Sequence, residues 1–418
     1  MELFQQLGDE VERLWREANY DEAKLPAIAK EALIRADLPS KLSAWDVLEW
    51  TLKQNTLPPQ RDVKANFGDP PITLYMGQRF HIDVYFWFDG TTATHQHSFS
   101  GAFQVLLGSS IHSWYEFERD AVINAYAETG TMNLKLCQLL EVGDIQEIWS
   151  GRKYIHSLFH LDQPSATIVV RTTNSPLDMP QFSYHKPGLA ADPFFERDDI
   201  TKKVQTISAL VRASRPDTDE QIANLLGASD LQTSFLYLSH LRGLFRGGHI
   251  AELFKLEEPG ARFIRFLNLV IEKHGATAEI LREVFAHFDI QDEIVNRRAY
   301  VTQPEHRFFI ALLMNLDNRE QIFKLVKDKF ADAEPVEKVL DWVFDLAQTR
   351  VVGIEATNAL GIPDFGEAEM SALEGLLNNK TDDEIAAGFA AENPNASPDT
   401  IQTALDKIRS AVIFRPLL

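Results

Sequence analysis

The sequence predicts an α+β protein in which helical segments precede and follow a compact central β unit. Apolar residues recur at helical spacing near the N-terminus and again after residue 197. Between about residues 72 and 185, short aromatic and β-branched runs are separated by turn residues, which is typical of strands. Because helices and strands are segregated along the chain, a doubly wound parallel sheet is not expected.

Residues 1–60 are predicted to form an N-terminal helical segment. Leu3, Leu7, Val11 and Leu14 are spaced as one face of a helix, and Ser43 is a candidate N-cap for a later helix in the segment. The stretch TLPPQRDVKANFGDPP then interrupts the pattern with four prolines and a glycine. Since proline removes a backbone donor and clashes with the preceding turn, no helix continues through this stretch.

The central unit, residues 61–190, is predicted to be an antiparallel barrel or sandwich because its strand-like runs are short and closely spaced. A second stretch rich in proline and glycine, NSPLDMPQFSYHKPGLAADP, follows these runs. Residues 198–290 and 304–348 return to helical spacing. Residues 191–418 are therefore expected to form a large, all-helical C-terminal domain.

Composition limits the function classes that need to be considered. The chain has 418 residues and a formal net charge of −20, which argues against binding to nucleic acid or to anionic membranes. No uninterrupted apolar stretch is long enough to span a bilayer. Cys137 is the single cysteine, so an intrachain disulfide and a thiolate metal cluster are both excluded. A cytoplasmic location is expected.

Three histidines in the β unit are candidate metal ligands. His95 and His97 are two residues apart, so on a strand their side chains project to the same face. His156 lies in another strand-like run after a glycine turn. Three neutral imidazoles converging in a small barrel suit iron, copper, nickel or zinc and leave coordination positions open. The alternative is that His95 and His97 are polar residues that hydrogen-bond the adjacent turn.

The segment around His95 and His97 resembles the first motif of the cupin family, whose members fold as small double-stranded β-helix barrels. That motif has a glycine, a short spacer, His-x-His, a glutamate and a later glycine. Gly90, His95, His97 and Gly108 match it. Gly101 and Ala102 stand where the glutamate would fall.

The segment around His156 is similar to the second cupin motif. Gly143, Gly151 and His156 follow the order of that motif, with Trp149 in place of its proline and His160 in place of its asparagine. The spacing is two residues longer than in the family. The resemblance to cupins covers residues 70–175.

Three histidines without the glutamate resemble the thiol dioxygenase branch of cupins, which oxidises cysteine or 3-mercaptopropionate at ferrous iron. The resemblance implies one divalent metal, Fe(II) in the first place, with zinc, nickel or manganese as alternatives. It also implies an arginine for the substrate carboxylate, for which Arg171 and Arg79 are the candidates. The Ser-His-Tyr set of that branch is not visible in this sequence.

Further site candidates come from the predicted strands. Gln104 is expected on the same inward face as Ala102, where its amide could contact a metal-bound water. Tyr85 has the same parity as Trp87 and could line the barrel. His160 could support a ligand from behind, and His112 is a weaker candidate for a fourth imidazole, expected in a turn after Gly108.

The sequence thus predicts a metal-dependent dioxygenase that uses O₂ and a small, anionic organic substrate. Two alternatives stay open. The barrel could be a non-catalytic binding or sensing module with the helices as its interaction surface, or a hydrolase or isomerase that uses the metal as a Lewis acid. The C-terminal helices could cover the barrel mouth or form a homodimer interface.

Overall fold

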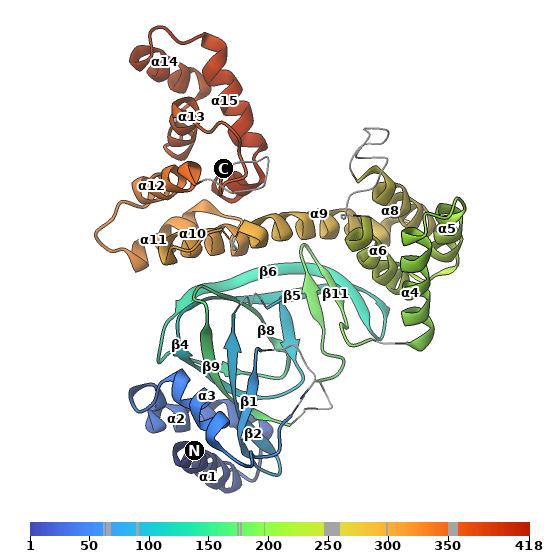
Figure 1. Cartoon of the computed structure of the whole chain (residues 1–418), viewed down its shortest axis with the longest axis vertical. Coiled ribbons are helices and arrows are strands. Elements are labelled where there is room, and N and C mark those ends of the chain that lie inside the picture. The colour runs from blue at the N-terminus through green and yellow to red at the C-terminus, as the bar shows by residue number, and fades with distance from the viewer. Residues whose placement is uncertain are drawn as a thin grey trace.

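The computed structural model confirms an α+β fold with helices before and after a β unit (Figure 1). Gly90 of the first motif lies outside the residues that can be described. The structure describes residues 1–61, 63, 68–88, 92–173, 175, 178–195, 197–245, 260–297, 300–349 and 358–418.

Three N-terminal helices cover one face of the β unit (Figure 1). They are α1 (Glu2–Glu17), α2 (Leu25–Ala36) and α3 (Ala44–Lys53). Ser43 caps α3 as predicted, because its hydroxyl accepts from the Asp46 amide and the Asp46 carboxylate accepts from the Ser43 amide. The buried face of α1 consists of Phe4, Leu7, Gly8, Val11 and Trp15. Leu3 and Leu14, expected on this face, are half-buried.

Two antiparallel sheets form the β unit, as in a double-stranded β-helix. The first has the order β1-β2-β9-β4-β7 and consists of β1 (Pro71–Met76), β2 (Phe80–Trp87), β9 (Ser165–Thr172), β4 (Gly101–Leu107) and β7 (Ile145–Ile148). The second has the order β10-β11-β6-β5-β8-β3 and closes through a β3–β10 pair. Its strands are β10 (Ser183–His185), β11 (Leu189–Ala191), β6 (Ala127–Leu140), β5 (Ser110–Asn124), β8 (Gly151–His160) and β3 (His95–His97).

Alternate residues of the first sheet serve two different cores. Ile82, Ala102 and Ile168 pack with the N-terminal helices on the outer face. Tyr85, Phe103 and Val169 pack on the inner face, together with Tyr154 and Leu158 of β8. Because side chains alternate along a strand, the parity of a residue decides whether it reaches the barrel interior.

Two groups of C-terminal helices pack on the second sheet. The first group is α4 (Asp198–Arg212), α5 (Thr218–Ala228), α6 (Leu231–Phe245), α8 (Ala261–His274) and α9 (Ala276–Arg297), which share a core with Leu189 and Ala191. The second is α10 (Pro304–Asn315), α11 (Arg319–Lys329), α12 (Pro335–Gln348), α13 (Glu367–Leu377), α14 (Asp382–Glu392) and α15 (Pro398–Ser410). Its core includes Ile111 and Phe159 of the barrel and Ile294 of α9.

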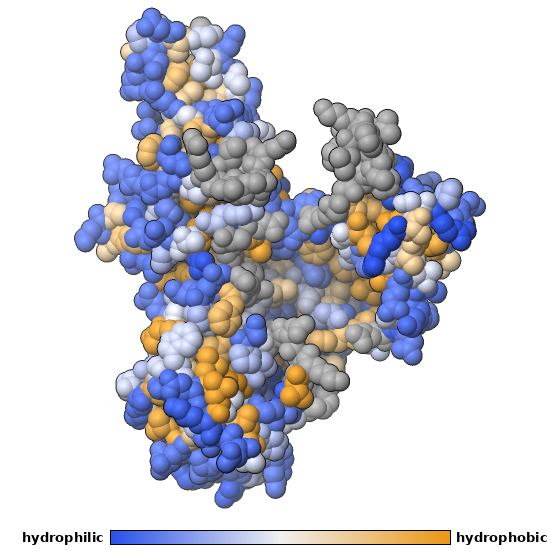
Figure 2. Space-filling model, in the orientation of Figure 1, coloured by the Kyte–Doolittle hydropathy of each residue, from blue (hydrophilic) through white to orange (hydrophobic). Residues whose placement is uncertain are grey.

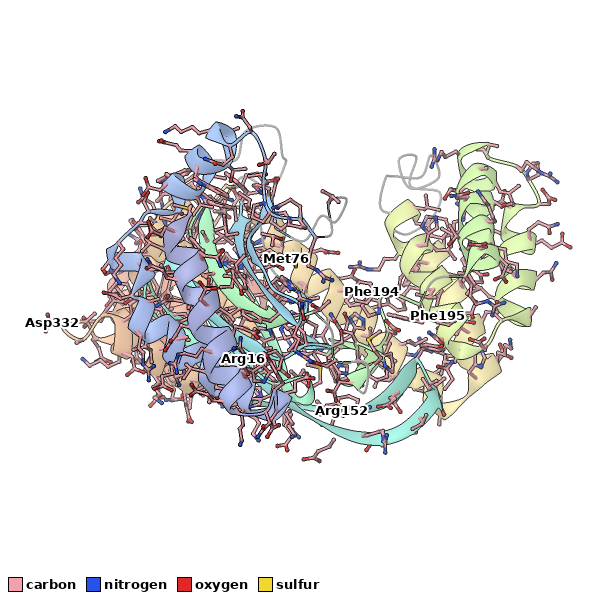
Figure 3. The ribbon with its side chains drawn as sticks, turned by 90° about the horizontal axis from the view of Figure 1, so that it is seen from below. Arg16, Met76, Arg152, Phe194, Phe195 and Asp332 are labelled. Atoms are coloured by element: carbon pink, nitrogen blue, oxygen red, sulfur yellow. The ribbon has the colours of Figure 1, made fainter. Side chains whose placement is uncertain are left out.

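Polar contacts join both groups to the barrel. The β5–β6 hairpin extends toward the first group (Figure 3), and the Asn124 amide donates to the Gln232 carbonyl oxygen at 2.7 Å. Arg307 of α10 donates to the Leu161 carbonyl at 3.2 Å and to the Gln163 side chain at 2.7 Å. The helices are therefore tied to the outer surface of the second sheet.

The visible surface of the molecule is largely polar. Figure 2 shows mostly hydrophilic residues on the visible face, with hydrophobic residues scattered over the barrel and helices. Among the helices that the structure describes, none has both the length and the apolar character required to cross a bilayer.

Candidate metal centre

The three predicted histidine ligands meet inside the barrel. In the antiparallel β3–β8 pair, His95 is opposite His156, and His97 lies two residues further along β3. One potential ligand atom from each of the three side chains lies within 4.8 Å of the others, and all three residues are buried. Within the described ranges, no other group of three or more His, Cys, Asp or Glu side chains meets this condition.

Burial keeps these imidazoles in the neutral form that metals require. Removal from solvent lowers the pKa of His95, and it lowers the pKa values of His97 and His156 well below their usual range, with neighbouring histidines adding to the effect. His95 Nδ1 lies 2.7 Å from the Ala93 carbonyl oxygen. A neutral His95 therefore donates from Nδ1 and leaves the lone pair on Nε2 free for a ligand.

The spacing of the donor atoms fits a transition metal. His97 Nε2 and His156 Nε2 are 2.8 Å apart, and two lone pairs at this separation repel unless a proton or a cation lies between them. Two imidazole nitrogens at a right angle around a metal, each about 2.0–2.1 Å from it, would be about 2.9 Å apart. Within the described part of the chain, Nδ1 of His97 and of His156 is buried without a hydrogen-bond partner.

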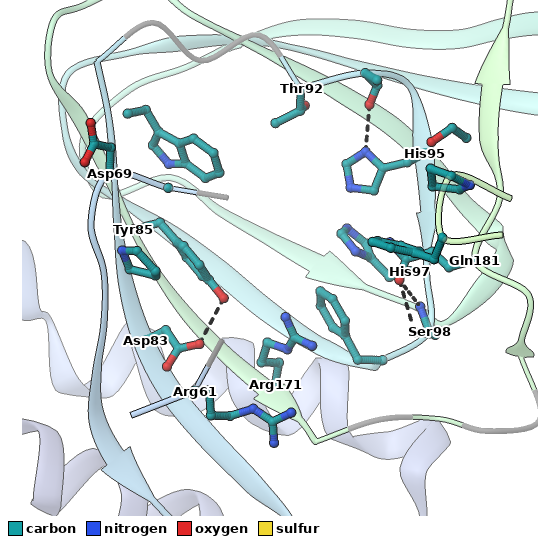
Figure 4. Close-up of a pocket in the computed structure, with 18 of the residues that line it drawn as sticks. Arg61, Asp69, Asp83, Tyr85, Thr92, His95, His97, Ser98, Arg171 and Gln181 are labelled. Carbon is teal, nitrogen blue, oxygen red and sulfur yellow. Dashed lines mark hydrogen bonds between the residues drawn. The ribbon is translucent and has the colours of Figure 1, made fainter. Parts of the chain in front are cut away.

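A cavity of about 1000 Å³ opens on His95 and His97 (Figure 4). Its wall also includes Tyr85 and Trp87 of β2 and Arg171 of β9. Figure 4 shows Arg171 and Tyr85 in the same cavity as the two histidines. The structure thus brings the predicted residues Arg171 and Tyr85 together with the histidine cluster.

Arg171 presents a positive charge close to the histidines. Its guanidinium carbon lies 3.5 Å from the centroid of the Phe99 ring, and that ring lies 4.2 Å from the His97 ring. No carboxylate of the described residues forms an ion pair with Arg171, and its Nε is buried without a hydrogen-bond partner there. A charge held in this way favours an anion in the cavity.

Tyr85 supplies a neutral phenol. Burial raises its pKa, and the nearby Asp83 carboxylate adds to the shift. The Tyr85 hydroxyl donates to Asp83 Oδ2 at 2.9 Å, and His81 Nε2 lies 3.2 Å from the same oxygen. Asp83 is thus engaged by two neighbours. Arg79, the alternative to Arg171, does not line the cavity, and its guanidinium lies 4.4 Å from the Tyr20 ring centroid.

The expected position of Gln104 is wrong. Ala102 packs in the outer core with the N-terminal helices, whereas Phe103 and Val105 face the interior. Gln104 has the parity of Ala102, and its amide donates to the Gly143 carbonyl at 3.2 Å. Since alternate residues point to opposite faces, Gln104 lies on the other side of β4 from the histidines and is not part of the cavity wall.

At Gly101, one of the two positions where the cupin glutamate would fall, the structure leaves no room for a side chain. A Cβ on Gly101 would lie 1.9 Å from the Val170 carbonyl oxygen. We therefore expect Gly101→Ala to lower the free energy of unfolding by roughly 1–3 kcal/mol, because the strands must separate. Chemical denaturation measures this change. Gly227→Ala is the control, since its Cβ would meet no atom within 4 Å, and it should be neutral or stabilising by up to about 1 kcal/mol. Equal effects of the two substitutions would contradict this packing.

His112 occupies a place that its sequence context did not indicate, whereas His160 lies at the end of β8, in its expected strand. His112 lies on β5 and not in a turn, is fully buried, and its Nε2 is 2.9 Å from the Tyr154 hydroxyl. Its ring centroid lies 5.3 Å from that of His156, behind the cluster. His160 Nδ1 contacts the hydroxyls of Ser110 and Ser165 at 2.9 and 2.7 Å. Neither residue belongs to the three-histidine group.

Two contributors to the cavity were missed in the sequence. Phe99 separates Arg171 from His97, as described above, and Arg61 lines the cavity from the stretch before β1. The only sequence signal at Arg61 is a cation inside a proline-rich break, which does not indicate where the chain leads.

Fold and site together define an α+β protein with a cupin-like barrel and a buried three-histidine group that could bind a metal ion. No family model and no curated protein matches the chain. One solved structure that matches is an uncharacterized conserved protein with a double-stranded beta-helix domain from Klebsiella pneumoniae, with 14% identity, a TM-score of 0.19, and coverage of 32% of this chain and 90% of that chain.

Another match is the capsular polysaccharide assembling protein CapF from Staphylococcus aureus. It has 17% identity and a TM-score of 0.16, and the matched part covers 25% of this chain and 29% of that chain. At these TM-scores, the fold class rests on the strand order given above.

Proposed function

We propose that this protein is a metal-dependent dioxygenase that uses non-haem Fe(II), O₂ and an organic anion. The observation that carries the proposal is the buried cluster of three neutral histidines at a cavity that also holds an arginine without an acidic partner among the described residues. Three neutral ligands leave the metal its full charge and open positions for substrate and O₂.

The histidine cluster and the residues of the cavity wall have separate tasks in this proposal. His95, His97 and His156 would hold the metal through ring nitrogens, and the bound metal would supply O₂ activation. Arg171 binds the acidic group of the substrate through paired N–H donors. Tyr85 stays protonated because its pKa is raised. Its single hydroxyl proton is donated to Asp83, so its oxygen is left to accept a hydrogen bond from the substrate, and the rings of Trp87 and Phe99 exclude water from one side.

Metal analysis and oxygen uptake test the proposal. Protein loaded anaerobically with Fe(II) should bind one equivalent and consume O₂ with at least one member of a panel of organic acids, including small thiol acids. Zinc-loaded protein is the control and should not consume O₂. Iron binding without O₂ consumption across the panel would favour a binding module. Absence of stoichiometric metal would exclude all the metal-dependent alternatives.

Arg171→Gln tests the assignment of the substrate anchor. The variant should keep its metal but raise KM roughly tenfold or more, because a charge-assisted pair is lost. Steady-state oxygen uptake measures this value. Arg79→Gln is the matched control, since Arg79 contacts Tyr20 outside the cavity. An unchanged KM in Arg171→Gln would contradict the role of Arg171.

A further inference from the structure

The size and lining of the cavity bear on the class of its ligand. Its volume of about 1000 Å³ is at the upper end of the range of about 300–1000 Å³ that holds drug-sized ligands. A small thiol acid would leave most of this space to water. The ring side chains Tyr85, Trp87, Phe88 and Phe99 form much of the wall, so a ligand with an apolar body is better matched.

The mouth of the cavity is also apolar. Phe88, Met179 and Phe194 line the cavity and are 43%, 54% and 65% exposed. Figure 3 places Phe194 where the chain leaves the barrel toward the first group of C-terminal helices. Three large apolar side chains exposed at one opening would be unfavourable in water. They provide surface that an apolar ligand can cover on entry.

Two arginines supply the charge of the cavity wall. Arg61 and Arg171 both line it (Figure 4), and the Nε of each is buried without a hydrogen-bond partner among the described residues. Two carboxylates are also present in the wall. Asp83 accepts from Tyr85 and contacts His81, and Asp69 is exposed, so solvent screens its charge. The two guanidinium groups are therefore available to an anionic head group.

We propose that the cavity binds an amphipathic organic acid, with its carboxylate held by Arg61 and Arg171 and its apolar body against the rings of Trp87 and Phe99. Arg61 is a specificity-determining residue in this assignment, contributed by the segment between α3 and the barrel. The role of this acid as a substrate rests on the proposed dioxygenase function. The binding of the acid does not depend on that function, because neither Arg61 nor Arg171 is a metal ligand.

Binding calorimetry with three matched probes tests the ligand class. 4-Phenylbutanoate should bind the full-length protein at least about tenfold more tightly than propanoate, which lacks the apolar body. It should also bind at least about tenfold more tightly than 4-phenylbutanamide, which lacks the charge. Equal affinity for 4-phenylbutanoate and propanoate would overturn the apolar subsite, and equal affinity for the acid and the amide would overturn the anion subsite.

Variants assign the head group to its residues. Arg61→Gln and Arg171→Gln should each weaken 4-phenylbutanoate binding roughly tenfold, whereas Arg79→Gln should bind as the parent protein does. Unchanged binding in Arg61→Gln would remove Arg61 from the site. The titrations are run with and without chelator. Binding of 4-phenylbutanoate that is retained with chelator would show that the subsite does not depend on a metal. Metal analysis and oxygen uptake test the dioxygenase function separately, so the failure of one proposal is distinguishable from the failure of the other.

Discussion

Replacement of His97 by alanine is expected to abolish stoichiometric metal binding. His97 Nε2 is the donor that lies 2.8 Å from His156 Nε2, and only two imidazoles of the group remain without it. Mutation of a residue that only hydrogen-bonds a metal ligand lowers metal affinity about 10–100-fold. Loss of a ligand itself should therefore lower metal affinity at least about 100-fold. Elemental analysis after dialysis, and competition with a chromophoric chelator, measure this loss.

The matched control for His97→Ala is His306→Ala. His306 lies on α10 and contacts the Asp345 carboxylate at 3.2 Å, away from the cluster, so its variant should bind metal as the parent does. Circular dichroism should show native secondary structure in both variants. Metal retained at one equivalent in a folded His97→Ala variant would remove the three-histidine site as the metal centre.

The histidine cluster could be predicted because its signal is local. His95 and His97 lie two residues apart on a strand, and the glycines near the ligands mark turns. Gly108 and Gly151 adopt φ values of 74° and 72°, a region that favours glycine. Short-range rules of this kind are readable from one sequence. The grouping of His156 with His95 and His97 followed from its resemblance to the second cupin motif.

The sequence could not show which residues of β4 face the barrel interior, because both faces of this strand are buried. Residues 101–106 are all buried, so the alternation of polar and apolar residues that reveals an inward face is absent. Gln104 was therefore assigned to the wrong side. The cause is tertiary: the N-terminal helices cover the outer face, and nothing in the strand itself records that they do. The position of Arg61 in the cavity wall is also set by tertiary packing and is not visible in the local sequence.

Metal-free protein is expected to lose stability as the pH falls from about 6.5 toward 4. Burial lowers the pKa of His112 to about 4, and desolvation also lowers the pKa values of His95, His97 and His156. In this window the unfolded chain binds protons that the folded state excludes, so the free energy of unfolding decreases as the pH falls. For His112 alone, a shift of this size corresponds to roughly 3 kcal/mol.

His112→Gln isolates one part of this dependence. Above pH 6.5 both states of His112 are neutral, so the substitution should not change the pH slope there. Between about pH 6 and 4.5, it should reduce the slope of unfolding free energy by about 1.4 kcal/mol per pH unit, which urea denaturation at successive pH values measures.

An unchanged slope in His112→Gln would mean that His112 is protonated in the folded barrel. The Gln138 Nε2 group donates to His112 Nδ1 at 3.2 Å, and an imidazolium has no lone pair to accept this hydrogen bond, so the contact would have to break while Nε2–H donates to the Tyr154 hydroxyl at 2.9 Å. Burial also lowers the pKa of His185 to about 4, so His185 should add a similar contribution that remains in the His112→Gln variant. Since burial also lowers the pKa values of His95, His97 and His156, protons should compete with a metal for these rings only well below the ordinary pKa of histidine.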